Sequence, residues 1–524
     1  MKLRKLDSVI IWSLIGLALL LRLPLLGDSF WLDEAAQALE LVRPWHQQLL
    51  IAADFQPPLL HLILHLAQYL STGEIWLRLI GAVIPGLISI YFALKLAERY
   101  LNINQVIWLG LLLTTSQLHI FFSQELRPYA LPAALASLSW WWLDRIISSR
   151  SLSGKRALTG HTSPANLIGF GLVTGLGLYS SYLYLFIIIA QLGYVIWHRR
   201  LSLVWPSFGL AGLMFAPWLP WFWEQLSVGT TLRAALPGWD QVVSTPQLKA
   251  LLLVPGKFLF GQVPLDPIAS GVTLAVAGMI AGLIITQFAI RHPLQMVFRT
   301  KIWPWLERFF GHKSDQRRLW LLSLVWLIVP FLTAWLISWW VPVVSPKRLL
   351  FSLPAFYLAI ISWDYLRQKR WLWHWVLATI LVINIIGLTN YWSQPQLQRE
   401  DWRSLVSDVH RDYSADTTLV VFGFEAPFSP WAWYEQDQSD PLPTLSTGYL
   451  TAPQDQAQIK TLLEPANHFR YVLVFDYLRD LTDPENLIPT TLEDMGYQEV
   501  GVYDSPNIGF VRIFSTHSAR IGAI

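Results

Sequence analysis

The sequence contains no cysteine among its 524 residues, so it can hold no disulfide bond, no thiolate nucleophile and no cysteine-ligated metal. Charged residues are scarce as well, at 14%, whereas hydrophobic residues make up 54% and the mean hydropathy is +0.40. This balance excludes a water-soluble enzyme and a disordered chain. The formal net charge of +3 is too small to indicate a nucleic-acid partner.

Several common catalytic motifs are also missing. The sequence has no P-loop, no GxGxxG, no Ser-His-Asp signature and no HExxH, so nucleotide hydrolysis, nicotinamide chemistry and zinc proteolysis lack support. Aromatic residues, in contrast, are plentiful. The 29 Trp and 18 Tyr suit a protein with many membrane boundaries, because their amphipathic rings settle at headgroup depth.

Long apolar runs predict an α-helical polytopic membrane protein with eleven spans. The runs cover residues 9–26, 77–97, 104–122, 128–145, 166–180, 182–197, 203–223, 268–290, 319–341, 347–364 and 372–391. No small-residue cleavage site follows the first run, so we interpret it as an anchor. The shorter apolar segment 58–70 carries two histidines and is interpreted as an interfacial or re-entrant helix.

Lys and Arg concentrate in alternate loops, which predicts a cytoplasmic N-terminus by the positive-inside rule. A twelfth span at 58–70 would move the basic clusters at 95–99 and 145–156 to the outer side, and we reject it. The long loops 27–76 and 224–267 then lie outside, where we expect the chemistry.

The composition becomes that of a soluble protein after Trp392. Strand-like runs alternate there with polar helical stretches, at residues 418–422, 471–475, 499–503 and 510–514. The pattern predicts a transmembrane domain of residues 1–392 and an extracytoplasmic α/β domain of residues 393–524.

Two acidic sites stand at the outer ends of spans. FWLDEAAQALE places Asp33 and Glu34 just after the first span, where burial or a bound cation would shift a carboxylate pKa. An alternative role for Asp33 is to cap the helix that follows. FSQELRPYAL places Glu125, Arg127 and Tyr129 after the third span, and an interfacial ion pair of Glu125 with Arg127 is the alternative there.

A cationic site follows in SPKRLLFSLP. Lys347 and Arg348 lie on the side that the positive-inside rule depletes of cations, which indicates a bound anion such as a lipid phosphate. Snorkelling toward headgroups is the alternative. Arg233 and Lys257, in the second long loop, are weaker candidates for the same role.

A metal site is left open by the segment DFQPPLLH. Its Asp54 and His61 lie on the same predicted side as Glu125 and could join it as ligands, but no known ligand spacing is present. A packed or hydrogen-bonded His61 is the alternative.

These motifs, with PWLPW at the end of the seventh span and DWRSL at 401–405, together resemble the bacterial GT-C glycosyltransferases, the branch related to protein O-mannosyltransferases and lipid A aminoarabinose transferases. The resemblance covers about residues 1–392. It implies a polyprenyl-phosphate-linked sugar donor and transfer, usually with inversion, on the non-cytoplasmic face of a bacterial inner or plasma membrane. The acceptor would be a glycan, a lipid or a protein.

The resemblance also implies residue roles. Asp33 would be the general base, Glu34 would assist it, and Glu125 would occupy the second acidic position. A donor phosphate would be held by the basic and phenolic candidates Arg127, Tyr129, Lys347, Arg348, Arg233 and Lys257. Two departures are that no Tyr follows Arg348 and that Gln56 stands where some relatives carry His or an acid, so metal dependence stays open.

Two rival functions remain at this point. A lipid-phosphate transporter or flippase would need the same spans and cations, but we find neither the repeated halves nor the broken helices typical of transporters. A membrane scaffold whose outer domain binds a partner would not need the acidic and cationic pairs. The gathering of polar candidates at one face favours an enzyme.

Overall fold

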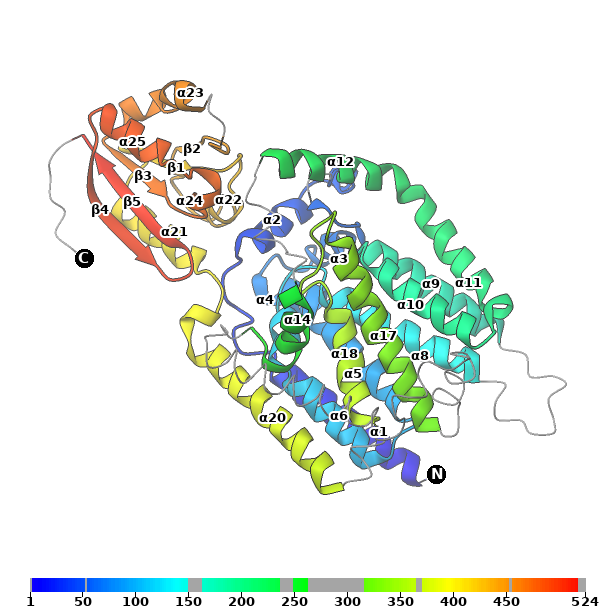
Figure 1. Ribbon diagram of the computed structural model, residues 1–524. Helices are drawn as coiled ribbons and strands as arrows, with labels where there is room; N and C mark the ends of the chain where they lie inside the picture. Colours follow the sequence, from blue (N-terminus) through cyan, green and yellow to red (C-terminus); the bar gives the residue numbers. More distant parts are fainter. Residues whose placement is uncertain are drawn as a thin grey trace, which may run out of the picture.

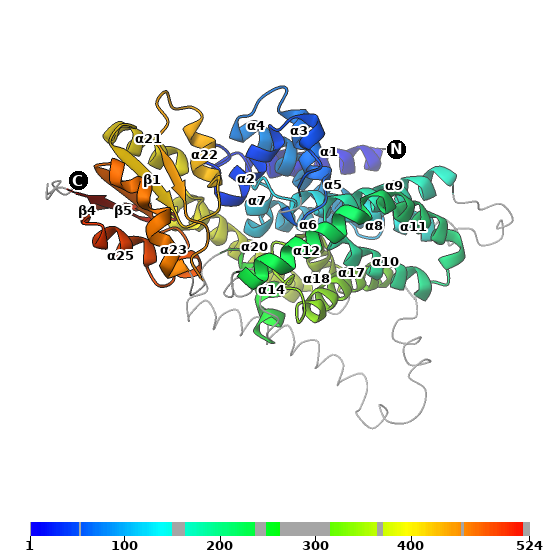
Figure 2. The same cartoon turned by 90° about the horizontal axis from the view of Figure 1, so that it is seen from above.

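The computed structural model describes residues 2–51, 54–148, 163–235, 248–262, 315–363, 370–451 and 455–516. A body of packed helices occupies most of the chain, and a sheet with its own helices follows at the C-terminal end (Figure 1). Seen from above, the sheet lies beside α2 and α4 of the helical body (Figure 2).

The helical body begins with α1 and ends with α20. Its α-helices are α1 (Lys2–Leu20), α2 (Leu32–Leu41), α3 (Leu59–Ala67), α4 (Glu74–Arg78), α5 (Ile84–Ala97), α6 (Ile103–Thr115), α7 (Gln117–Phe122), α8 (Ala130–Ser148), α9 (Pro164–Ser180), α10 (Tyr184–Trp197), α11 (Leu201–Phe215), α12 (Leu219–Ala235), α14 (Leu248–Phe260), α17 (Asp315–Ile337), α18 (Leu353–Ile361) and α20 (Arg370–Ser393). Short 3₁₀ turns are η1 (Trp45–Gln47), η4 (Ala216–Trp218), η6 (Leu350–Ser352) and η7 (Pro395–Leu397), and the π-helical turn η3 (Leu79–Val83) joins α4 to α5.

Each predicted apolar run other than 268–290 overlaps one of these helices, and the run at 268–290 lies outside the described residues. Within the described ranges, four helices are long and apolar enough to cross a membrane by length and composition: Glu74–Ala97, Leu201–Thr230, Gln316–Ile337 and Trp371–Ser393. The apolar helices identify an integral membrane protein. The predicted second outer loop contains a helix that the sequence analysis did not anticipate, α14.

Local sequence explains where the elements next to the site begin and end. Asn102 caps α6 with a reciprocal pair of hydrogen bonds to Gln105, which satisfies the free amide groups of the first turn. After α6 and the short α7, which ends at Phe122, the next helix α8 starts at Ala130. Pro128 lies two residues before that start, where its missing amide hydrogen costs no helical hydrogen bond. The loop between α7 and α8 carries Glu125.

The C-terminal sheet has the strand order β2-β1-β3-β5-β4. The strands are β1 (Thr418–Phe422), β2 (Thr444–Ser446), β3 (Tyr471–Phe475), β4 (Gln498–Ser505) and β5 (Gly509–Ser515). Strands β2, β1 and β3 are parallel, with Val420 opposite Leu473, whereas β5 is antiparallel to both β3 and β4. The four predicted strands are confirmed. Only the three-residue β2 escaped the sequence analysis, because it is too short to form an apolar run.

Helices flank this sheet in the α/β manner predicted. They are α21 (Trp402–Asp412), α22 (Ser429–Glu435), α23 (Asp455–Leu462), α24 (Arg479–Thr482) and α25 (Leu487–Asp494), with the 3₁₀ turn η8 (Glu464–His468). Strand β1 is buried along its whole length, which is typical of a strand that helices cover on both faces.

The connector after α20 and the helices α21 and α22 contact the segment between α1 and α2 through hydrogen bonds that involve the backbone. Ser29 Oγ donates to the carbonyl of Glu400 at 2.6 Å and accepts from the amide of Trp402 at 2.9 Å. The amide of Phe30 donates to Tyr434 Oη at 2.5 Å. The chain entering α2 is therefore fixed from the C-terminal side as well as by the helical body.

The same segment is fixed from the other side by Arg78, which is fully buried. Its guanidinium donates to both oxygens of Glu34, at 2.9 and 2.5 Å. It also donates to three carbonyl oxygens in the turn before α2, those of Leu26, Asp28 and Ser29, at 3.0, 2.5 and 3.0 Å. One side chain thus sets both the path of the turn and the position of α2.

We expect Arg78→Met to lower the free energy of unfolding by about 3–5 kcal/mol, because it leaves the buried Glu34 carboxylate without its main partner. Arg403→Gln is the control, since the Arg403 side chain is 49% exposed in its ion pair with Glu74, and such pairs contribute about 0–1 kcal/mol. Unfolding of the two purified variants in detergent measures the difference. Equal stability of the two would contradict the role given to Arg78.

Candidate functional site

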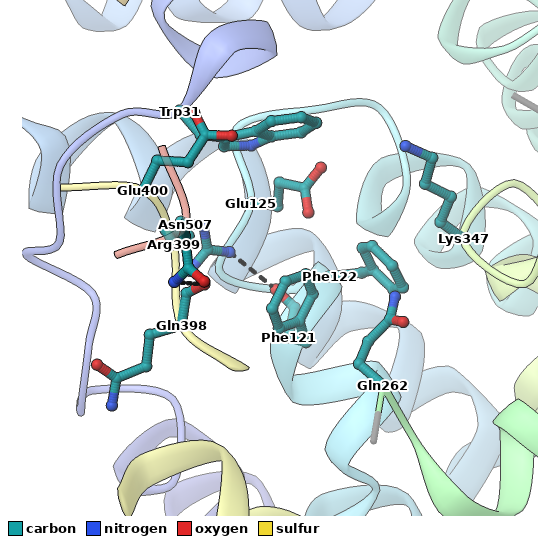
Figure 3. Close-up of a pocket in the computed structure, with 10 residues that line it drawn as sticks. All are labelled: Trp31, Phe121, Phe122, Glu125, Gln262, Lys347, Gln398, Arg399, Glu400 and Asn507. Atoms are coloured by element: carbon teal, nitrogen blue, oxygen red, sulfur yellow. Dashed lines mark hydrogen bonds between the residues drawn. The ribbon is translucent and has the colours of Figure 1, made fainter. Parts of the chain in front are cut away.

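A cavity of about 290 Å³ lies where the helical body meets the C-terminal segment. Figure 3 shows the residues that line it: Trp31, Phe121, Phe122, Glu125, Gln262, Lys347, Gln398, Arg399, Glu400 and Asn507. Aromatic rings form much of the wall, and both carboxyl groups and cations face the interior. This combination suits a polar ligand with an apolar part.

Glu125 points into this cavity (Figure 3) and is only 2% exposed. Its Oε1 has no hydrogen-bond partner among the described residues. Burial raises the pKa of Glu125 to about 7, although the nearby cations Lys347 and Arg399 act in the opposite direction. Such a carboxyl group can accept from, or donate to, a ligand at neutral pH.

Lys347 faces Glu125 from the other side of the cavity (Figure 3). Its Nζ lies 5.7 Å from the centre of the Trp31 ring and 5.6 Å from that of Tyr129, as in cation–π contacts. Among the described residues, no carboxylate is within ion-pair distance of Lys347. Its neighbour Arg348 donates to the carbonyl of Pro342 at 2.5 Å and lies within electrostatic reach of Asp33 and Arg127.

Asp33 is the more accessible member of the first acidic pair, with 35% of its side chain exposed. It lies in the first turn of α2, where negative charge is favoured by the helix dipole. Arg127 Nε is 3.8 Å from Asp33 Oδ2, and Arg127 Nη1 donates to Asp54 Oδ1 at 3.1 Å. Arg127 thus connects the carboxylate of Asp33, in α2, with that of Asp54, in the segment between α2 and α3.

The segment that carries Asp54 is attached to α12. Gln225 of α12 donates to the carbonyls of Ile51 and Gln56 at 2.7 and 3.0 Å, and its own carbonyl accepts from Tyr182 Oη. The position of Asp54 therefore depends on α12.

Glu34 is placed differently from Asp33. It is fully buried, both of its oxygens accept from Arg78, and the amide of Leu126 donates to Oε1 at 2.6 Å. Burial by itself would raise the pKa of Glu34, but Arg78, Arg399 and these hydrogen bonds hold it below its usual value. Glu34 is a charged structural partner with no oxygen open to the cavity.

The three metal-ligand candidates are not brought together. His61 Nδ1 is 2.7 Å from Gln37 Nε2 and 3.7 Å from Glu40 Oε2, while Asp54 is engaged by Arg127 and Gln56. Within the described ranges, no group of three or more His, Asp or Glu side chains could hold a metal ion. Glu125, Asp54 and His61 are therefore not arranged to bind a divalent metal ion together, and the proposed mechanism uses no metal.

The two weaker cation candidates are not part of the cavity wall. Lys257 lies in α14 and is absent from the lining residues. Arg233 belongs to α12, but its side chain lies outside the described part of the structure.

The sequence analysis predicted only Glu125 and Lys347 among the lining residues, and it missed two charged ones, Arg399 and Glu400. Both stand immediately before the DWRSL segment, beyond the last predicted span, where charged residues are common. Glu400 accepts from Trp402 Nε1 at 2.6 Å and from Tyr477 Oη at 2.8 Å, and burial raises its pKa to about 7. Their closeness to a recognised motif was the only signal in the sequence.

Solved structures with a similar fold were found. The oligosaccharyltransferase of Archaeoglobus fulgidus, tethered with an acceptor peptide containing the NVT sequon, has a TM-score of 0.50 at 13% identity, covering 97% of this chain and 74% of that one. Its apo form has a TM-score of 0.49, also at 13% identity, with coverage of 97% and 74%. The fold is of the GT-C type.

The GT-C resemblance predicted from the sequence is therefore confirmed at the level of the fold. ArnT from Cupriavidus metallidurans in the apo state has a TM-score of 0.42 at 11% identity, covering 99% of each chain. No family model matches the sequence, and no curated protein matches it significantly.

Glu125→Gln is expected to change how stability depends on pH. The pKa of Glu125 rises from its usual 4.5 to about 7 in the folded chain, so between these values the folded state binds a proton that the unfolded state has lost. Stability from this group is complete below pH 4.5 and is lost as the pH rises through 7, by roughly 3 kcal/mol at 1.36 kcal/mol per pKa unit.

Unfolding free energies at pH 4 and pH 8, on the two sides of this window, measure the effect. The decrease from low to high pH should be smaller in Glu125→Gln than in the wild type. The same substitution at the exposed Glu425 controls for loss of a carboxylate as such. An unchanged decrease in Glu125→Gln would contradict the assignment.

Proposed function

We propose that this chain is a GT-C glycosyltransferase that moves a sugar from a polyprenyl-phosphate-linked donor to an acceptor hydroxyl on the extracytoplasmic face, with inversion. The observation that supports this best is convergence: Asp33, Glu125, Arg127 and Lys347 come from distant stretches of chain and interact around one region. The GT-C fold supports a transferase.

Asp33 is the best general base of the acidic pair, because its carboxylate is accessible whereas Glu34 is saturated by Arg78. It would take the proton of the acceptor hydroxyl as the acceptor oxygen bonds to the anomeric carbon. Such assistance is typically worth about 10²–10⁴-fold in rate. The ion pair with Arg127, itself attached to Asp54, would orient Asp33.

The leaving group needs positive charge. As the bond from the anomeric carbon to the phosphate oxygen breaks, its electron pair stays on the polyprenyl phosphate, and fixed cations stabilise the developing charge. Lys347 suits this role because it faces the cavity without a carboxylate partner among the described residues. Arg348 and the hydroxyl of Tyr129 would add contacts to the phosphate.

The remaining acids receive different roles in this proposal. Glu125, with one unpartnered oxygen in the cavity, would hydrogen-bond a hydroxyl of the donor sugar. Glu34 would act as a positioning residue that fixes α2 and thereby Asp33. The segment 393–524 would form an extracytoplasmic domain beside the acceptor, which is a glycan, a lipid or a protein.

Asp33→Asn should abolish transfer, because an amide cannot accept the acceptor proton, while the protein still folds and binds donor. The assay follows incorporation of radiolabelled sugar in membranes that contain the full-length protein. The exposed Glu224→Gln on α12 is the matched control, expected to retain activity. Turnover of Asp33→Asn at the wild-type rate would exclude Asp33 as the base, and donor binding with no transfer by the wild type would favour a flippase.

Orientation can be tested directly, because the absence of cysteine lets a single introduced thiol report its own side of the membrane. His46→Cys, exposed in the first predicted outer loop, should react with an impermeant maleimide on intact cells. Arg199→Cys, exposed between α10 and α11 on the predicted inner side, should react only after permeabilisation. The reverse pattern would overturn the topology.

A further inference from the structure

One wall of the cavity comes from the connector between α20 and α21. Gln398, Arg399 and Glu400 lie there, and Asn507 joins them from the turn between β4 and β5. Asn507 Nδ2 donates to the carbonyls of Pro395 and Gln398, at 2.8 and 3.3 Å. The opposite wall, with Lys347, belongs to the helical body (Figure 3).

Arg399 holds this connector against the helical body. Its guanidinium donates to Tyr391 Oη at 3.3 Å and to the carbonyl of Phe121 at 3.2 Å. Its centre lies 5.0 Å from the middle of the Phe121 ring. The residue is only 8% exposed, and its Nε makes no hydrogen bond among the described residues.

Arg399 shares its nearest carboxylate with Arg78. Arg399 Nε is 3.5 Å from Glu34 Oε2, but Glu34 already forms the two-bond pair with Arg78. The two carboxyl groups that line the cavity, Glu125 and Glu400, have pKa values raised to about 7 by burial, so each is partly protonated at neutral pH. The lining of the cavity thus holds two cations on facing walls, Arg399 and Lys347, and its own two carboxyl groups are only partly ionised.

Building on the proposed function, we propose that Arg399 is a second anion-binding residue of the cavity, and that a phosphate group held between Arg399 and Lys347 clamps the C-terminal connector onto the helical body. The two cations belong to opposite walls of the cavity. A doubly charged phosphate group between them would bind both and so bridge the walls. Guanidinium gives paired hydrogen bonds to phosphate oxygens, which makes Arg399 the more directional partner.

The inference predicts a ligand effect that does not require sugar transfer. Farnesyl phosphate, a short polyprenyl phosphate, serves as the probe on the full-length protein in nanodiscs. At saturation it should slow hydrogen–deuterium exchange in peptides that cover residues 394–403, because it ties the connector to the opposite wall. Inorganic phosphate, added in a separate arm, separates a free anion from a lipid headgroup, and farnesol controls for the prenyl chain.

Arg399→Gln should weaken farnesyl phosphate binding by about tenfold or more, as expected for the loss of a hydrogen bond to a charged group, and should remove the slower exchange. Arg399→Lys, which keeps the charge, should restore part of both. Arg411→Gln, an exposed cation on α21, should change neither. Protection by inorganic phosphate alone would support the clamp and assign it to the phosphate group.

Unchanged affinity in folded Arg399→Gln, absence of protection in the saturated wild type, or equal protection by farnesol would each overturn the proposal. If Arg399→Gln does not fold, Lys347→Gln replaces it. The Lys347 side chain makes no hydrogen bond among the described residues, its only hydrogen bond there being the one its carbonyl accepts from the Leu350 amide, so its loss should weaken binding and protection without disturbing the fold. The transfer assay is independent of these measurements. A wild type that binds farnesyl phosphate and shows slower exchange in the connector, but transfers no sugar, would contradict only the glycosyltransferase assignment.

Discussion

The buried pair of Glu34 with Arg78 is the constraint on which the rest of the site depends. An ion pair in a fully buried setting contributes little net stability, since desolvation of both charges offsets their attraction. Its value lies in specificity: any path of the turn before α2 that moved the carbonyls of Leu26 to Ser29 would leave charges and donors unpaired. Because Asp33 directly precedes Glu34 in the chain, the same ion pair also fixes the position of Asp33.

The helical body and the C-terminal segment build the cavity together. The cavity has walls from the helical body and from the C-terminal connector, and Ser29 and Phe30 hold this connector, α21 and α22 to the segment before α2. The turn between β4 and β5 adds Asn507 to the lining. Glu400 links the cavity to this unit as well, because it accepts from Tyr477, next to β3, and from Trp402 of α21.

Sequence reasoning reached the fold class because its signals are local. Apolar runs and alternating strands report directly on burial, and polar residues at the ends of apolar runs stand out against their surroundings. Only the resemblance gave Asp33 and Glu34 different roles; the residues alone could not show that Glu34 is buried in an ion pair, because its partner Arg78 lies 44 residues away. Arg399 and Glu400 were missed because they look ordinary in a polar stretch, and only the return of the connector to Phe121 makes them exceptional.

The turn between β4 and β5 supports one wall of the cavity, which matters for protein engineering. Hairpin tips are usually where a protein tolerates added sequence best. This tip is different: Asn507 has a φ of 65°, in the left-handed region that Asn accepts more readily than most residues, and its amide group is committed to two carbonyls of the connector. An epitope tag or fluorescent reporter inserted here would break the two hydrogen bonds of Asn507 and displace the cavity wall. This exposed turn is therefore a poor insertion site.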